Sequence, residues 1–416
     1  MSADPPRGAV SHLAALTVVI PTFNRPGHLK RLLTYYERVN LQTQFLILDS
    51  SDAATAAANA ALASSLGARF RHVIFPSSLP VATKLFQGLG LVETPYSAFC
   101  ADDDLVFPGA LAHALDFLST HADYVCCDGI YLNFFPTNGE IQIKVEYGSR
   151  GIEAQNPAAR VFRLYQRYES MFYAVFRTPD LRDIFSYVHT IPSLHYQELF
   201  QAAGALLKGK SHRLPEFYAA RQHCDAAEPT RSNWQTFYWF VDDSAEFLAH
   251  YNAYRSELWR LYESCSAEPR MDSKAFGVAM DVAHAVFFSY NCPPAYFHSR
   301  MQDQWPADPY VDIKNIHGVL EDLKDESRQA LGAGLAQIAC ALRFLTRGFA
   351  KISDLMTEQE IKRVRPIAVR RLNRETAALL PGNTWKCDLP GDLAWLASAP
   401  DFRKAFLELC QYMAPL

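Results

Sequence analysis

Short apolar runs alternate with helical patterns along the first 120 residues of the chain. Runs rich in β-branched and aromatic residues predict buried strands over residues 16–20, 45–48, 71–75 and 96–100. Apolar residues that recur at helical spacing predict helices over residues 26–38, 53–66, 81–89 and 109–119. Strands separated by helices of this length form parallel sheets through right-handed crossovers. The pattern therefore predicts an α/β fold.

Polar residues follow the predicted strands where each strand ends. In open parallel sheets, ligands bind beyond the carboxyl ends of the strands. We therefore expect one polar rim formed by Thr22, Asn24, Arg25, residues 49–52 and residues 102–104. The first turn, IPTFNRPG, has neither the GxGxxG nor the GxxxxGK[ST] spacing. This disfavours a dinucleotide dehydrogenase and a P-loop NTPase.

Three consecutive aspartates, Asp102, Asp103 and Asp104, end the fourth predicted strand in the stretch FCADDDLVFP. Like charges at this spacing repel, so a compensating cation is expected near them. Carboxylates are typical ligands of Mg²⁺ and Mn²⁺, which complete their shells with water and substrate phosphates. The alternative is an acidic loop or helix cap, with Asp104 serving the helix that begins near Gly109.

The pattern changes after residue 225. Residues 232–265 are aromatic and helical in period, and amphipathic helices predominate from there to the end of the chain. We expect a flexible N-terminus over residues 1–15, an α/β domain over 16–225 and an α-helical C-terminal domain over 226–416. A basic cluster over residues 343–374 is either a contact surface for anionic lipids or, more simply, a solvated helix face.

Composition narrows the functional classes. A chain of 416 residues usually divides into about two domains. Its 40 basic and 44 acidic residues give a formal net charge of −4, which argues against nucleic acid as a main partner. The nine cysteines show no two-residue gap of the metal or redox type, so reduced thiols are expected. Without a secretory signal or a long apolar run, a cytoplasmic protein is expected, with peripheral contact at the inner membrane face through residues 343–374 as a further option.

Three segments in order, VVIPTFNRPGHLKRLL, FLILDSSD and ADDDLVFPGAL, resemble the family 2-like glycosyltransferases with the GT-A fold. The resemblance covers roughly residues 16–225 and implies a GT-A, Rossmann-like, mainly parallel sheet flanked by helices. It further implies sugar transfer from a nucleoside-diphosphate sugar, with a UDP-sugar as the expected donor. The acceptor would be a hydroxyl of a glycan, a lipid-linked molecule or a protein.

The resemblance also implies roles for individual residues. Asp49 would accept a hydrogen bond from the nucleobase, and Lys84 would meet a donor phosphate unless it is a surface lysine of an amphipathic helix. The acidic motif has two registers: Asp102 and Asp104 when DxD is taken directly, or Asp103 when Pro108 is the anchor. The implied nucleotide and donor contacts are Pro21, Thr22, Asn24, Arg25, Asp49, Ser51, Lys84, Asp102, Asp103 and Arg221, and the implied ligands of Mn²⁺ or Mg²⁺ are Asp102, Asp103, Asp104 and His223.

Two later segments extend the resemblance. Glu198 in SLHYQELF lies where the family has its catalytic base, which in an inverting transfer takes the proton of the acceptor hydroxyl. An exposed helix charge is the alternative. Arg221 and His223 end a predicted strand, and in related enzymes such residues close over the diphosphate, because guanidinium pairs with phosphate and neutral imidazole binds metal. His223 alternatively caps a loop, and His195 is either an acceptor contact or a buried polar histidine.

The sequence thus predicts a metal-dependent inverting glycosyltransferase. Two alternatives remain open. A nucleotidyltransferase also uses a parallel sheet and metal-binding aspartates, but it usually has a glycine-rich basic loop that is absent here. A non-catalytic GT-A-fold protein would bind a sugar nucleotide or a partner without turnover.

Overall fold

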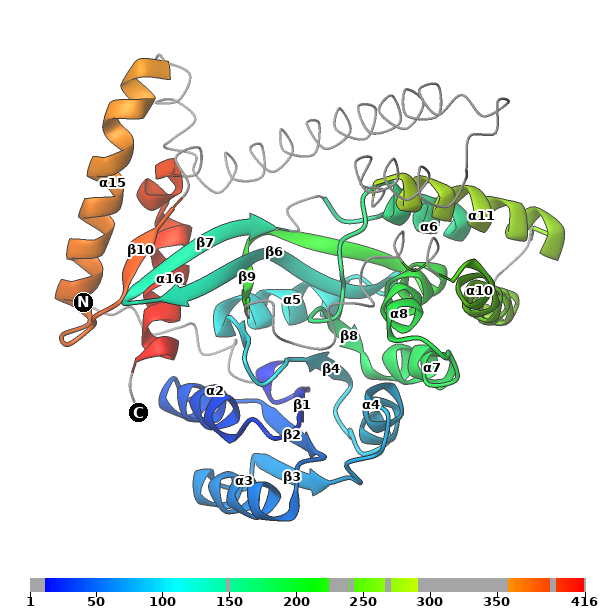
Figure 1. Ribbon diagram of the computed structural model, residues 1–416, viewed down its shortest axis with the longest axis horizontal. Coiled ribbons are helices and arrows are strands. Elements are labelled where there is room, and N and C mark those ends of the chain that lie inside the picture. The colour runs from blue at the N-terminus through cyan, green and yellow to red at the C-terminus, as the bar shows by residue number, and fades with distance from the viewer. Residues whose placement is uncertain are drawn as a thin grey trace, which may run out of the picture.

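The computed structural model describes residues 12–146, 150–223, 239, 243–265, 271–290, 358–389 and 394–414. Its centre is a ten-stranded mixed sheet with helices on both faces (Figure 1). The main strand order is β10-β7-β6-β8-β4-β1-β2-β3, and β5 and β9 pair beside this path. The predicted α/β architecture with a mainly parallel sheet is confirmed.

The four predicted strands form the parallel half of the sheet. They are β1 (Leu16–Thr22), β2 (Gln44–Asp49), β3 (Phe70–Ile74) and β4 (Tyr96–Phe99). β1 pairs with β2 and with β4, and β2 pairs with β3, all in parallel. The helices of this half are α2 (Pro26–Arg38), α3 (Ala53–Leu66), α4 (Val81–Leu89) and α5 (Pro108–Thr120). The predicted order of strands and helices is confirmed.

Burial on both faces explains why β1 is apolar at almost every position. Val18 and Ile20 lie in one hydrophobic core, which they share with Leu29 of α2. Val19 points to the other face and shares a second core with Leu85 of α4. Successive side chains of a strand alternate between faces, so a parallel strand covered by helices on both sides needs an unbroken apolar run.

The other half of the sheet contains long-range pairings that local patterns did not predict. β8 (Val175–Arg177) runs antiparallel to β4 and to β6 (Tyr124–Thr137), and β7 (Glu140–Glu146) forms a hairpin with β6. β9 (Lys210–Gln222) lies parallel to β6 and antiparallel to the short β5 (Leu105–Val106). The pairing of β5 with β9 brings the residues after β4 to the end of β9.

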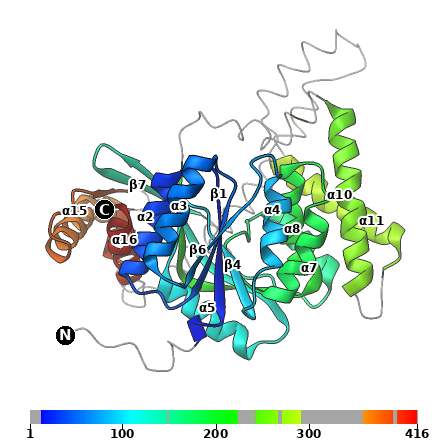
Figure 2. The same ribbon diagram turned by 90° about the horizontal axis from the view of Figure 1, so that it is seen from below.

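Two helical layers cover the sheet. Figure 2 shows α2 and α3 on one side, and α4 with α7 (Thr178–Val188) and α8 (Leu194–Lys208) on the other. The second layer also contains α6 (Pro157–Gln166), and it continues outward into α10 (Ser244–Cys265) and α11 (Ser273–Tyr290). No helix among the described residues is long and apolar enough to cross a bilayer.

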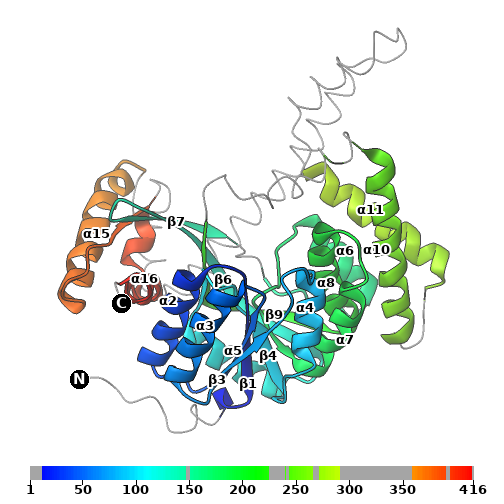
Figure 3. The same ribbon diagram turned by 60° about the horizontal axis from the view of Figure 1, so that its bottom comes forward.

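The described C-terminal elements share the two cores of the sheet. α15 (Glu358–Leu379) and α16 (Pro400–Met413) lie on the α2 side of the molecule, and α10 and α11 lie on the α8 side (Figure 3). β10 (Lys386–Asp388) joins the edge of the sheet in parallel to β7. The region is mainly helical as predicted, whereas a domain boundary after residue 225 stays a prediction. Residues 1–11 of the predicted N-terminus and 343–357 of the basic segment lie outside the described residues.

Candidate active site

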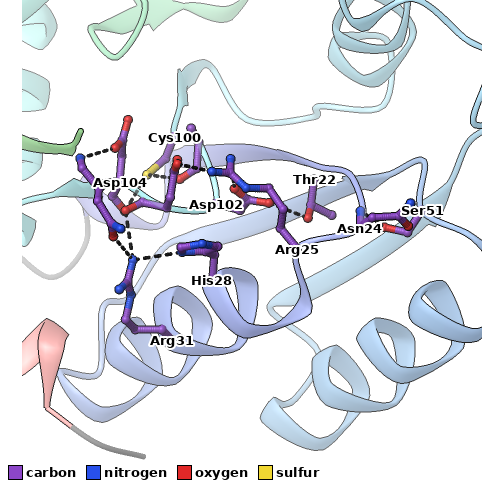
Figure 4. A network of polar contacts seen from close by, with 12 residues as sticks. Thr22, Asn24, Arg25, His28, Arg31, Ser51, Cys100, Asp102 and Asp104 are labelled. Atoms are coloured by element: carbon purple, nitrogen blue, oxygen red, sulfur yellow. Dashed lines mark hydrogen bonds and ion pairs between the residues drawn. The ribbon is translucent and has the colours of Figure 1, made fainter. Parts of the chain in front are cut away.

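The polar rim predicted from the strand ends is assembled at the carboxyl ends of β1 and β4. Figure 4 shows Thr22, the last residue of β1, and Arg25, which follows β1, pointing toward Asp102 in the turn after β4. Arg31 of α2 lies beneath the same turn. Two segments that are far apart in the sequence, residues 22–31 and residues 102–104, therefore meet at this turn.

Asn24 fastens the turn after β1 to the turn after β2. Its backbone adopts the left-handed conformation, with φ of 53°, which asparagine tolerates better than most residues. The Asn24 amide donates to Ser51 Oγ at 2.8 Å, and Asn24 Oδ1 accepts from the Asp52 amide at 2.9 Å. This crossing fixes the start of α2 and thereby the position of Arg25.

Arg25 bridges the first two aspartates of the triplet. Its guanidinium donates to Asp102 Oδ1 at 3.1 Å and to Asp103 Oδ2 at 2.5 Å. Thr22 Oγ1 donates to the other oxygen of Asp102 at 2.7 Å. Burial raises the pKa of Asp102 to about 6, against the lowering effect of Thr22 and Arg25. Arg25 thus supplies a positive charge beside these two carboxylates, and the metal ion expected at the triplet stays a prediction.

Asp104 connects the acidic turn to β9. Asp104 Oδ1 accepts from the Gln222 amide at 2.6 Å, and its other oxygen accepts from the hydroxyl of Tyr173. Burial and the charge of Asp103 raise the pKa of Asp104 to about 7. α5 begins after Phe107 without a side-chain cap, so the alternative of Asp104 as its helix cap is wrong.

The three carboxylates differ in exposure. Asp103 has the largest exposed fraction, 8%, against 2% for Asp102 and 6% for Asp104. Both oxygens of Asp102 and both oxygens of Asp104 accept hydrogen bonds from the protein itself. The geometry therefore favours the register in which Asp103 faces a ligand.

Asp49 is buried and fully engaged at the end of β2. One oxygen accepts from the Ser51 amide at 2.8 Å, and the other accepts from Asn59 Nδ2 at 2.8 Å and His72 Nε2 at 2.9 Å. Burial opposes ionisation, but these hydrogen bonds outweigh it and lower the pKa of Asp49. Its contact with a nucleobase stays a prediction. The sequence patterns did not single out Asn59 or His72.

Lys84 is a buried cation rather than a surface residue. Only 3% of the residue is exposed, so that alternative is wrong. Its Nζ donates to the Thr22 carbonyl at 3.1 Å and to Ser50 Oγ at 2.8 Å. Burial lowers the pKa of Lys84 to about 8, while the charges of Asp49 and Asp102 raise it. Lys84 thus links the end of β1 to the residue that follows β2 through hydrogen bonds.

The predicted base is Glu198 of α8, and its pKa is affected by Arg221 at the end of β9. α8 begins after Ser193, whose Oγ accepts from the Tyr196 amide, and Glu198 lies half-buried in its second turn. Burial raises the pKa of Glu198 to about 7, and the positive charge of Arg221 lowers it. The positive charge of Arg221 also lowers the pKa of Asp104. The charge of Arg221, at the end of β9, therefore lowers the pKa of both carboxyl groups.

The two predicted histidines have different surroundings. His223 is exposed, and its ring packs edge-on against Phe135 with centroids 4.5 Å apart. Its role as a metal ligand stays a prediction. His195 is 5% exposed, and burial lowers its pKa to about 4. His195 is thus a buried polar histidine.

The four predicted metal ligands are not assembled into one cluster. Over the described parts of the chain, no group of three or more His, Cys, Asp or Glu side chains is placed to hold one ion. Mg²⁺ and Mn²⁺ commonly use only one or two protein carboxylates together with substrate phosphates. Asp103, the least buried of the three aspartates, fits such a ligand set.

Several site residues carried no local sequence signal. Their contacts join segments that are distant in the chain, so only the fold identifies them: Arg31, Asn59, His72, Tyr173, Gln222 and Tyr412.

Residues 17–177 match the family model described as Glycosyl transferase family 2. Among solved structures, TarS 1-349 from S. aureus is 13% identical, with 76% of this chain and 91% of that chain covered and a TM-score of 0.37. The mannosyltransferase PcManGT from Pyrobaculum calidifontis, solved with GDP-Man and Mn²⁺, is 15% identical, with 79% and 86% covered and a TM-score of 0.39. No curated protein matches the sequence. Within residues 17–177, the chain is therefore similar to the family 2 glycosyltransferases, and this segment contains the parallel half of the sheet.

Proposed function

We propose that the chain transfers a glycosyl residue from a nucleoside-diphosphate sugar to an acceptor hydroxyl, with inversion at the anomeric carbon. The observation that supports this most directly is the assembly of Thr22, Arg25 and the aspartate triplet at the carboxyl ends of β1 and β4. The charge of Arg221 at the end of β9 also lowers the pKa of both Asp104 and Glu198. A leaving diphosphate needs positive charge, and an attacking hydroxyl needs a base on the opposite side. Arg25 and Arg221 lie at strand ends, where α/β sheets bind ligands, and Glu198 lies in the second turn of α8.

The donor side of the proposed site is the rim around Thr22 and Arg25. The Arg25 side chain is 30% exposed, so its guanidinium is accessible to a phosphate while it holds Asp102 and Asp103. Arg221 would pair with the diphosphate in the same way. The Asn24–Ser51 crossing would border the nucleoside, for which a UDP-sugar remains the expected donor.

A divalent ion, Mn²⁺ or Mg²⁺, would supply charge stabilisation to the departing diphosphate when bound. Asp103 is the proposed protein ligand because its carboxylate is the most exposed of the three. His223 is the proposed second ligand, since it follows Gln222, whose amide holds Asp104. Arg25 would then share Asp103 with the ion and keep Asp102 in place.

Glu198 is the proposed base. Its oxygen would take the proton of the acceptor hydroxyl as that hydroxyl attacks the anomeric carbon. Burial raises the pKa of Glu198 to about 7, which makes the carboxylate a stronger base than an exposed glutamate. The proposed acceptor is a glycan, a lipid-linked molecule or a protein, and membrane contact through residues 343–374 stays a prediction.

A melting scan with nucleotides tests the donor site. The protein is heated with UDP, GDP, dTDP or CMP, each with and without Mn²⁺. We expect stabilisation by a nucleoside diphosphate that requires the metal, because a ligand that binds only the folded state raises the melting temperature. Stabilisation by CMP alone would favour another donor class, and no stabilisation by any nucleotide would contradict the proposal.

Replacement of Glu198 by Gln tests the base. We expect Glu198→Gln to keep nucleotide binding and to lower transfer by about 10²- to 10⁴-fold, the usual contribution of a positioned base. The wild-type rate is expected to rise with pH through about 7 and then level off, because only the ionised carboxylate accepts a proton. Glu263→Gln, at an exposed position of α10, is the matched control. Undiminished transfer by Glu198→Gln would remove Glu198 from the mechanism.

A further inference from the structure

The last helix of the structure reaches the acidic turn. The hydroxyl of Tyr412 in α16 donates to the backbone carbonyl of Asp103 at 2.8 Å, across 309 positions of the sequence. Tyr412 is 1% exposed, so water does not compete for this hydrogen bond. The contact is made with the backbone of the aspartate whose carboxylate is the most exposed of the triplet.

A second donor meets the same carbonyl from α2. Arg31 donates to the Asp103 carbonyl at 3.2 Å and to Gln222 Oε1 at 2.5 Å, and Figure 4 shows it beneath the turn. The Arg31 guanidinium also lies over the ring of Tyr412, 4.4 Å from its centroid. Tyr412 and Arg31 thus form one assembly that joins α2, α16, β9 and the acidic turn.

Tyr412 is held rigidly although it lies near the end of the chain. The residue after it, Met413, receives Arg31 at its sulfur at 3.3 Å and Trp385 Nε1 at its carbonyl at 3.0 Å. Phe402, Phe406 and Leu409 of α16 are fully buried in the core beneath the sheet. Packing of α16 in the core therefore fixes the position of the Tyr412 hydroxyl independently of the acidic turn.

We propose that Tyr412 is a positioning residue of the donor site: α16 fixes the backbone of Asp103 so that its carboxylate keeps facing the ligand. Within the turn, the backbone hydrogen bond joins the Asp104 amide to the Ala101 carbonyl at 3.2 Å, so the Asp103 carbonyl is oriented by donors from outside the turn, Tyr412 and Arg31. The role of Asp103 toward a nucleotide rests on the proposed function. The positional role of Tyr412 does not.

Two tyrosine-to-phenylalanine variants provide the test. Tyr412→Phe removes the hydroxyl that holds Asp103 and keeps the ring over which Arg31 lies. Tyr35→Phe is the control: Tyr35 of α2 is also 1% exposed, contacts the Tyr412 ring edge-on and donates to Glu408 of α16 at 3.5 Å. Each variant loses one buried hydroxyl, from Tyr412 to the acidic turn or from Tyr35 to α16, so similar decreases in melting temperature are expected.

Hydrogen exchange measures the position of the turn without any ligand. We expect the amides of residues 101–107 to exchange about tenfold faster in Tyr412→Phe than in wild type, because one neutral hydrogen bond is lost. Tyr35→Phe should leave them at the wild-type rate. Unchanged exchange in Tyr412→Phe, or equal acceleration in both variants, would overturn the proposal.

Nucleotide affinity measures the consequence for the site. Titration of UDP and GDP with Mn²⁺ should give a dissociation constant about tenfold higher for Tyr412→Phe, and Tyr35→Phe should match wild type. Equal affinity of Tyr412→Phe and wild type would overturn the role in donor binding. If wild type binds neither nucleotide under these conditions, the proposed donor fails, and the exchange measurement still decides whether Tyr412 positions the turn.

Discussion

Lys84 shows how single buried charges hold the rim together. Its ammonium group lies near two buried carboxylates, those of Asp49 and Asp102, and donates to the backbone carbonyl of Thr22. A buried charge is tolerated when it is paired and hydrogen-bonded, and its loss leaves the partners uncompensated. Lys84 is therefore expected to stabilise the folded state through its hydrogen bonds and its charge interactions with Asp49 and Asp102.

Replacement of Lys84 by Met tests this role. We expect the free energy of unfolding to fall by about 1–3 kcal/mol, because the Thr22 carbonyl and the Ser50 hydroxyl lose a donor and two carboxylates lose a nearby cation. Nucleotide affinity should fall with it. Chemical denaturation measures the change, and Lys30→Met, at an exposed position of α2, is the control. Equal stability of the two variants would contradict the role assigned to Lys84.

Single residues also show where sequence reasoning succeeded. Thr22, Arg25 and Asp102 follow predicted strands, so the rule for strand ends was sufficient to bring them together. Tyr412 could not be predicted in the same way, because its contact with Asp103 depends on how a distant helix packs. Local sequence patterns predict which residues lie at the strand ends. The residues that hold them in place, such as Tyr412, depend on long-range packing and are not predicted.

At the scale of elements, a buried polar network joins α6, α8, α10 and α11. His284 of α11 donates from Nδ1 to the Met280 carbonyl at 2.7 Å and accepts at Nε2 from Tyr254 of α10 at 3.1 Å. The Tyr254 hydroxyl contacts that of Tyr165 in α6. Burial lowers the pKa of His284 to about 4, and burial together with His284 lowers that of His195 in α8 to about 4. Both imidazoles are therefore neutral in the folded state near pH 7.

This network predicts acid sensitivity of the outer helices. Between the ordinary histidine pKa of 6.5 and the folded value of about 4, the unfolded chain binds more protons than the folded chain. Stability should thus fall with falling pH in this window, by about 1.4 kcal/mol per pH unit for each histidine. Melting temperatures from pH 7 to pH 5 measure the slope. His284→Gln should flatten it, and His121→Gln, at an exposed position, should not. An unchanged slope in His284→Gln would contradict the prediction.

The boundaries of helices were predicted correctly where residues next to the helix mark its ends. α2, α3 and α4 begin and end at the predicted residues, since proline, Asp52 and glycine mark their ends within the sequence. β6 and β8 carry no comparable signal, because their pairing with β9 and β4 joins distant segments. The strand pairing in the antiparallel half of the sheet was therefore known only from the structure.

At the scale of the whole molecule, the described C-terminal helices complete cores that the first 225 residues begin. Phe402, Phe406 and Leu409 of α16 lie in the core on the α2 side, and residues of α10 and α11 lie in the core on the α8 side. Burial of one such side chain contributes about 1.5–3 kcal/mol. Several of them together equal the net stability of a typical domain, about 5–15 kcal/mol.

A fragment of residues 1–225 is therefore expected to lose its cooperative fold. Without α10, α11 and α16, both faces of the sheet expose apolar side chains, and Asp103 loses Tyr412. We expect the full chain to melt cooperatively, and the fragment to show no near-UV circular dichroism and to bind an apolar dye. A chain that begins at residue 12 is the control and should melt like the full chain. Cooperative melting of the fragment, with nucleotide affinity intact, would instead make the segment 16–225 an independent domain and assign no structural role to α16.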